Sequence, residues 1–206
     1  MARLGCSTAE EHRHEVVESF GRMLPAYDAD LWDHSDVVAD LGLLVAAEID
    51  FDHPDRLLVA DAGVVHDLGK LGVPRSILDK PGPLTVEERR AVERHPAIGA
   101  DMLLAISPHL TALAEAVHSH HERWDGSGYP DQLAGEEIPR AGRVLAVVDV
   151  YSALTQQRSY RSKVFSPGEA RAFLEEHAGS HFDPQCVEAT VGVLQARRIR
   201  RRHFSS

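Results

Sequence analysis

Apolar residues recur along the chain at the spacing of an α-helix. A stripe that advances by three or four residues at each step is formed by Leu31, His34, Val38, Leu41 and Val45. No segment alternates apolar and polar residues over the length of a β-strand. The pattern therefore predicts an all-α fold, a compact helical bundle.

Local motifs predict where helices begin and end. Thr85 and Glu88 have the spacing of a capping box, which opens a helix that would run to about His95. Gly69 is expected to close the apolar segment before it, in the C-terminal role that glycine often takes. The Asp-Pro pair at 183–184 predicts the start of the last helix.

The segment 122–139, ERWDGSGYPDQLAGEEIP, breaks the helical pattern. It contains several glycines and prolines and few apolar anchors. An irregular stretch of this length inside a compact domain is typically functional or mobile. The basic tail at 197–203 is interpreted more simply, as a solvated helix end whose cations suit the negative pole of the helix dipole.

Composition narrows the class of protein. The 206 residues carry a net charge of −10, which argues against binding nucleic acid by neutralising its phosphates. No apolar run approaches the ~20 residues of a membrane span, and the N-terminal residues lack the apolar core of a signal peptide. Cys6 and Cys186 are too few for a disulfide framework, so we expect a reducing, cytoplasmic setting.

The chain has 13 histidines, an unusual number that directs attention to metal binding. His34 alone is ambiguous, because a single histidine on an apolar face is more often a core residue bonded to a carbonyl. His66 and Asp67 end an apolar segment, and a buried carboxylate without a partner is costly, so Asp67 needs a cation. His120 and His121 end another apolar segment in the same way.

Two further residues extend this set. His95 is expected to close a third helix, and Asp149 lies among valines in the apolar run RVLAVVDVYSAL. Imidazole and carboxylate groups without thiolates suit iron, manganese, zinc or magnesium. The set is too large for one tetrahedral ion. It suits two octahedral ions that share a carboxylate, an arrangement that hydrolyses phosphate esters.

With these residues identified, the chain resembles the HD superfamily of metal-dependent phosphohydrolases. The segment HHERWDGSGYP at 120–130 is similar to the hallmark of its HD-GYP branch, the cyclic di-GMP phosphodiesterases. Further blocks in the family's order are HDLGKLGVPRSILDKPGPLT, HPAIGA, LAGEEIPRAGRVLAVVDVY and RSYR. The resemblance implies an N-terminal helix at 1–25, an HD-GYP catalytic domain at 26–185, and a C-terminal helix with a basic tail at 186–206.

The resemblance also implies a binuclear metal centre. One ion would be held by His34, His66, Asp67 and Asp149, and the other by Asp67, as a bridge, with His95, His120 and His121. Lys70 matches a lysine near the scissile phosphate, where it would stabilise charge or assist the leaving oxygen. Positions that match substrate contacts are Tyr129, Arg158 and Arg161. The implied cofactors are two divalent transition-metal ions, iron or manganese in preference to zinc.

Two positions depart from the family pattern. Ser152 stands where the family often has aspartate, which removes a carboxylate one turn from Asp149 and alters the support of that ligand. Asp30 stands where some members carry a glutamate that holds a third ion, and its shorter side chain argues against a third metal. His118 lies near the cluster, has no role in the family, and is interpreted as structural.

Residues and resemblance together predict a phosphodiesterase that hydrolyses cyclic di-GMP to pGpG, with cleavage onward to GMP left open, by a metal-bridging hydroxide. One alternative is an HD hydrolase of another cyclic dinucleotide. Another is a weakly active signalling module that binds protein partners through the segment 122–139. The complete ligand set favours an enzyme. Neither nucleic acid nor a membrane is an expected partner.

Overall fold

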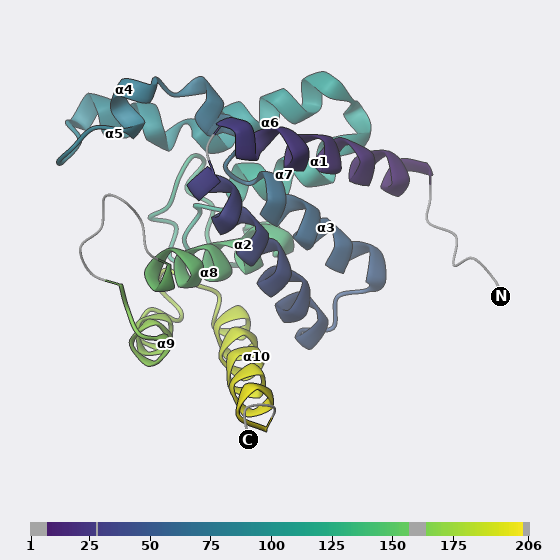
Figure 1. Ribbon diagram of the computed structural model, residues 1–206, viewed down its shortest axis with the longest axis vertical. Coiled ribbons are helices and arrows are strands. Elements are labelled where there is room, and N and C mark those ends of the chain that lie inside the picture. The colour runs from purple at the N-terminus through teal and green to yellow at the C-terminus, as the bar shows by residue number, and fades with distance from the viewer. Residues whose placement is uncertain (1–7, 28, 157–163, 204–206) are drawn as a thin grey trace.

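The computed structural model describes residues 8–27, 29–156 and 164–203, with side chains described for 8–26, 34–156 and 164–197 (Figure 1). Its helices are α1 (Thr8–Tyr27), α2 (Ala29–Glu48), α3 (His53–Val65), η1 (Leu68–Gly72), α4 (Arg75–Leu78), α5 (Val86–Glu93), α6 (His95–Ile106), η2 (Pro108–Leu110), α7 (Thr111–Ser119), η3 (Gly135–Glu137), α8 (Arg140–Thr155), α9 (Pro167–Glu176) and α10 (Pro184–His203), where η marks a 3-10 helix. Within the described ranges there are isolated β-bridges but no strand. The predicted all-α fold is confirmed.

Among the described residues, one hydrophobic core joins α1, near the N-terminus, to α10, near the C-terminus. α2 packs against α3 and α8, and the predicted apolar stripe from His34 to Val45 is buried along this contact. Val17 of α1 and Val187 of α10 belong to the same core. Figure 1 shows α2, α3, α7 and α8 in the middle of the molecule, with α4 and α5 at one end and α10 at the other. None of the described helices is both long and apolar enough to span a bilayer.

The capping box that was predicted at the start of α5 is confirmed, because the Thr85 hydroxyl accepts from the Glu88 amide and the Glu88 carboxylate accepts from the Thr85 amide. The predicted end of this helix is wrong. α5 ends at Glu93, and His95 begins α6 instead of closing α5. Pro96 accounts for the break, because its missing N–H removes a bond inside a helix but none in a first turn.

Gly69 has a different role from the one predicted. It lies inside η1, after α3 has ended at Val65, and it is not among the glycines with positive φ. A Cβ at position 69 would lie 1.9 Å from the His95 carbonyl oxygen and 2.5 Å from the Gly99 nitrogen. Glycine is required because the backbone of η1 lies directly against α6, and this approach brings Asp67 next to His95.

Candidate metal centre

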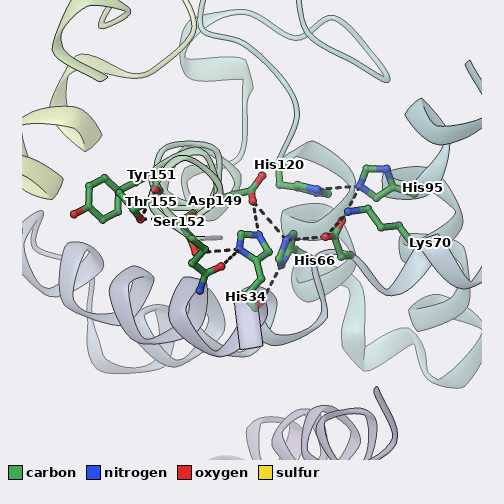
Figure 2. Close-up of polar contacts among 12 residues, drawn as sticks. His34, His66, Lys70, His95, His120, Asp149, Tyr151, Ser152 and Thr155 are labelled. Carbon is green, nitrogen blue, oxygen red and sulfur yellow. Dashed lines mark hydrogen bonds and ion pairs between the residues drawn. The ribbon is translucent and has the colours of Figure 1, made fainter. Parts of the chain in front are cut away.

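The interiors of two helices and the ends of others bring the predicted ligands to one place. Figure 2 shows five of these ligands side by side: His34, His66, His95, His120 and Asp149. α2 supplies His34, the junction of α3 and η1 supplies His66 and Asp67, α6 begins with His95, α7 is followed by His120 and His121, and α8 supplies Asp149. Two groups of potential ligands form: His34, His66 and Asp149, and His95, His120 and His121. Within each group the ligand atoms lie within 4.8 Å of one another.

Asp67 lies between the two groups and directs one carboxylate oxygen at each. Its Oδ2 is 3.4 Å from His66 Nε2, and its Oδ1 is 3.2 Å from His95 Nε2. Lys70 Nζ donates to Oδ2 at 2.6 Å. The carboxylate therefore has the placement that a bridging ligand requires, with an ammonium group beside it.

The backbone orients three of the imidazoles in the same way. His66, His95 and His120 each donate from Nδ1 to the carbonyl three residues earlier, at 2.8, 2.8 and 2.5 Å. These carbonyls lie in the last turns of helices, where carbonyls have fewer partners within the helix. Because a carbonyl only accepts, Nδ1 carries a proton in each ring, and Nε2 is the nitrogen that faces the centre. The helix ends therefore fix the tautomer that a metal ligand needs.

His34 is oriented by side chains instead. Its Nδ1 lies 2.9 Å from Ser152 Oγ and 3.2 Å from Gln156 Oε1, and its Nε2 lies 2.7 Å from Asp149 Oδ1. A hydroxyl and an amide oxygen thus take the place of the aspartate that the resemblance suggests at position 152. Since neither group is charged, the support for His34 is weaker than a carboxylate would give.

The two carboxylates of the cluster, Asp67 and Asp149, carry its negative charge. Burial opposes their ionisation, yet Lys70 and the neighbouring histidines hold the pKa of Asp67 well below its usual value. Burial is likewise outweighed at Asp149, where the His34 hydrogen bond and the other histidines lower the pKa. Both side chains are therefore anionic at neutral pH. Asp67 and Asp149 in turn raise the pKa of His66 against the effect of burial.

Two imidazoles of the second group, those of His120 and His121, are neutral. Burial, followed by repulsion from the other histidines, holds the pKa of His120 well below its usual value, and burial lowers that of His121 to about 4. His95 Nε2 and His120 Nε2 lie 3.3 Å apart, so two lone pairs face each other. His66 Nε2 is buried without a hydrogen bond. Converging lone pairs beside anionic carboxylates fit a divalent cation.

The segment 122–139 folds back onto its own first residues, just after the end of α7. A Cβ on Gly128 would lie 2.6 Å from Glu122 Cα, so only glycine allows this approach. The Tyr129 amide donates to the His121 carbonyl at 3.2 Å, and the two rings lie 4.9 Å apart between centroids. Burial raises the pKa of Tyr129, helped by nearby carboxylates, so its hydroxyl keeps its proton and can donate.

The remaining predicted residues are Arg158, Arg161, Asp30 and His118. Arg158 and Arg161 lie outside the described residues, as does the side chain of Asp30. His118 is placed, and its Nε2 lies 2.9 Å from Asp131 Oδ2 on the segment 122–139, a contact between structural elements.

Sequence reasoning missed two residues at the site, Glu122 and Gln156. Glu122 is only 2% exposed and directly follows His121; because the helix has already ended there, helical spacing gave no indication of its burial. Gln156 follows Ser152 by four residues, and this spacing was the available indication that both reach His34.

A helical fold that brings histidines and aspartates together in this way is typical of the HD superfamily. The comparison with known families gives the same assignment. The family model described as "HD domain" matches residues 18–186, and the chain belongs to this family. The resemblance to the HD-GYP branch is confirmed by curated relatives that are cyclic dinucleotide phosphodiesterases.

Three of these relatives show the range of similarity. A cyclic di-GMP phosphodiesterase of Vibrio cholerae is 46% identical over 66% of this chain and 29% of its own length. The cyclic di-GMP phosphodiesterase response regulator RpfG of Xanthomonas campestris is 35% identical over 88% of this chain and 48% of its own. The 3'3'-cGAMP-specific phosphodiesterase 3 of Vibrio cholerae is 37% identical over 87% and 38%. The chain therefore spans less than half the length of each.

Solved structures agree on the fold. An HDG"Y"P protein from Bdellovibrio bacteriovorus superimposes with a TM-score of 0.65 at 17% identity, covering 90% of this chain and 64% of that chain. A cyclic GMP-AMP-specific phosphodiesterase of Vibrio cholerae gives a TM-score of 0.58 at 20% identity, covering 80% and 44%.

Proposed function

We propose that the protein is a metal-dependent phosphodiesterase that hydrolyses cyclic di-GMP to pGpG. The observation that carries the proposal is the position of Asp67, with one oxygen directed at each of two ligand groups. A carboxylate shared between two cation sites is an arrangement that hydrolyses phosphate esters. Relatives named cyclic di-GMP phosphodiesterases support the choice of substrate.

The cofactors in this proposal are two divalent ions, iron or manganese in preference to zinc. One would be held by His34, His66 and Asp149, the other by His95, His120 and His121, with Asp67 between them. Nitrogen and oxygen ligands without a thiolate support this choice of metals. When bound, such ions neutralise charge on the phosphoryl oxygens and lower the pKa of water.

The remaining side chains bind and orient the substrate. Lys70 Nζ is held beside Asp67 on a side chain that is 22% exposed, so it can turn a proton toward a phosphate oxygen. Tyr129 keeps its proton and can donate a hydrogen bond beside the neutral His121. Arg158 and Arg161, three residues apart, would clamp phosphate with planar, paired donors. These cations would let a chain of net charge −10 bind an anionic dinucleotide.

The proposal is tested by turnover with purified protein reconstituted with Mn²⁺, or with Fe²⁺ under anaerobic conditions. Chromatography and mass spectrometry should show cyclic di-GMP disappearing and pGpG accumulating, and GMP at later times would reveal a second cleavage. Elemental analysis of the same sample should find close to two ions per chain. Protein that holds both ions and cleaves no cyclic dinucleotide would contradict the proposal.

A second candidate substrate is 3'3'-cGAMP, because relatives that are 37% and 39% identical are named for it. The kcat/KM values for cyclic di-GMP and 3'3'-cGAMP, measured side by side, separate the two assignments. We expect cyclic di-GMP to be preferred by about 10-fold or more, the discrimination that a few altered contacts to a base provide. The reverse preference would assign the chain to 3'3'-cGAMP.

The proposal places this enzyme in the cytoplasm and gives the segment 122–139 a second role in docking a signalling protein. Its exposed residues Asp125 and Ser127 offer polar contacts for such a partner. A charge reversal at Asp125 should then weaken co-purification of the partner while leaving turnover of cyclic di-GMP unchanged.

A further inference from the structure

Glu122 is a buried acidic group beside the candidate centre that the proposed function leaves without a role. Its side chain is fully enclosed, with 2% of the residue exposed, and it directly follows His121. A buried carboxylate needs a cation or several hydrogen bonds. Two roles are therefore open to Glu122: ligation of a metal, or support of the neighbouring chain.

The contacts of Glu122 favour support. Its Oε1 accepts the Asp131 amide at 2.7 Å, and its Oε2 accepts the Leu133 amide at 3.1 Å. Both oxygens are thus directed at the backbone of the segment 122–139. Among the described residues, Glu122 belongs to neither group of potential metal ligands. The carboxylate therefore holds the turn at 131–133 in place.

This turn needs to be held. Gln132, between the two bonded amides, has φ +60°, a left-handed conformation that residues other than glycine and asparagine rarely adopt. A free chain would relax from it. Charge-assisted bonds from a buried carboxylate are strong enough to keep the conformation.

The turn is next to Tyr129 in the chain, and both are fixed to the same helix end. The Tyr129 amide donates to the His121 carbonyl at 3.2 Å, and the Glu122 carboxylate accepts from Asp131 two residues further on. The short stretch between these bonds has little freedom. The position of the Tyr129 ring, 4.9 Å from that of His121, therefore depends on both bonds.

We propose that Glu122 is a positioning residue, which holds Tyr129 against His121 through the amides of Asp131 and Leu133 and thereby sets substrate binding without ligating a metal. The inference rests on the proposed function, because it assumes that Tyr129 contacts the substrate. His118 also contacts Asp131 and helps to hold the same turn. The His118 side chain is 30% exposed and that of Asp131 is 55% exposed, so this contact stabilises the turn less than the Glu122 hydrogen bonds do.

The first test is amide hydrogen exchange in the metal-loaded protein. Glu122→Gln replaces one accepting oxygen with an NH₂ group, so at least one of the Asp131 and Leu133 amides should exchange roughly 10- to 100-fold faster. Glu137→Gln is the matched control, because the Glu137 carboxylate also accepts a backbone amide, that of Ala134 at 3.2 Å, but is exposed. Unchanged exchange at both amides in Glu122→Gln would overturn the inference.

The second test separates support from ligation. Metal content and metal affinity of Glu122→Gln should match wild type by elemental analysis and titration. A folded variant that has lost an ion would make Glu122 a ligand and overturn the inference.

Gln132→Gly removes the left-handed strain. Added to Glu122→Gln, this substitution should restore part of the lost protection of the Asp131 and Leu133 amides. No recovery would contradict the role assigned to the strained turn at Gln132.

The third test asks whether Glu122 acts through Tyr129. Glu122→Gln should raise KM for cyclic di-GMP about 10-fold with a smaller change in kcat. In a Tyr129→Ala background the same substitution should add less than about 2-fold, because the side chain it positions is absent. Full additivity would overturn the route through Tyr129. Failure of wild type to cleave cyclic dinucleotides would refute the proposed function alone, since exchange and metal content still decide the role of Glu122.

Discussion

At the scale of single residues, the candidate centre depends on which nitrogen of each imidazole is free. Backbone carbonyls near helix ends accept hydrogen bonds from Nδ1 of His66, His95 and His120. All three rings therefore direct Nε2 toward the centre. The anionic Asp67 sits among these lone pairs with a low pKa. Metal binding should therefore depend on Asp67 more than on any single histidine, because this carboxylate has one oxygen directed at each ligand group.

We expect Asp67→Asn to reduce metal content from close to two ions to below one per chain. The amide carries no charge and has a single accepting oxygen, so it cannot bridge two cations. Activity toward cyclic di-GMP should fall by more than about 100-fold. Elemental analysis and steady-state kinetics on the purified variant measure both effects.

The control for this variant is Asp61→Asn, a buried carboxylate on the same stretch of chain. Asp61 Oδ2 accepts from Arg13 Nε at 2.7 Å and so fastens α3 to α1. Its loss should lower the free energy of unfolding by about 1–3 kcal/mol and leave two ions bound. Equal metal content in the two variants would show that Asp67 is not shared.

Ser152 gives a second prediction at this scale. We expect Ser152→Ala to weaken metal binding at the His34 group roughly 10-fold, because support groups of this kind orient the ligand. Gln156 Oε1 remains near His34 Nδ1 and limits the loss. Thr155→Ala is the control, since its hydroxyl donates to a backbone carbonyl of α8. Competition with a chelator of known affinity measures the change, and equal affinities in both variants would contradict it.

The identity of the gathered residues could be predicted from the sequence, because charged or imidazole groups inside apolar runs need partners. Their orientation could not. It depends on which carbonyls are free at a helix end and on Ser152 and Gln156, whose contacts with His34 span 118 and 122 residues. The burial of Glu122 was not predicted, because this residue lies beyond the end of α7 at Ser119, where helical periodicity gives no information about burial.

At the scale of elements, the junctions between helices carry the site. The capping box of α5 could be predicted from the sequence, because its two residues are close in sequence. The role of Gly69 could not be predicted, because glycine is required there by close contact with the backbone of α6, which is distant in sequence. The prediction for His95 failed for a different, local reason. The sequence placed His95 at the end of a helix, and the structure places it at the beginning of α6, because Pro96 suits a first turn and not a helix interior.

Gly69→Ala tests this junction. A Cβ 1.9 Å from the His95 carbonyl oxygen forces η1 away from α6. Overpacking of this kind costs about 1–3 kcal/mol or more of unfolding free energy. The shift should also separate Asp67 from His95, so metal content should fall together with stability. Urea unfolding and elemental analysis measure the two effects.

Gly192→Ala, in α10, is the matched control. A Cβ there meets nothing within 4 Å, so alanine should stabilise the helix by about 0.5–1 kcal/mol without affecting metal content. Gly69→Ala protein with wild-type stability and two bound ions would show that η1 and α6 have room to accommodate the side chain.

At the scale of the whole molecule, the centre ties together segments that are distant in sequence. His34 and Asp149 are 115 residues apart, and His95 and His120 are 25 apart. The same helices share one hydrophobic core with α1 and α10. Periodicity predicted that these helices exist but not which of them pack together, because packing is decided by long-range complementarity. Ions bound by groups from α2, α3, α6, α7 and α8 should therefore stabilise the fold as a whole.

Removal of metal should lower the melting temperature of the protein substantially. Ions that bind the folded state alone stabilise it by about 2.7 kcal/mol per site when free metal is 100 times Kd. Each kcal/mol shifts Tm by roughly 2–4 °C for a chain of this size, so two sites predict a fall of roughly 10–20 °C on chelation. Calorimetry of the Mn²⁺-loaded protein before and after chelation, then after adding Mn²⁺ back, measures the shift and its reversal. Asp67→Asn protein, treated identically, should shift by less than half as much. Equal melting temperatures for loaded and chelated wild type would mean that the histidine and aspartate groups do not hold ions in the folded protein.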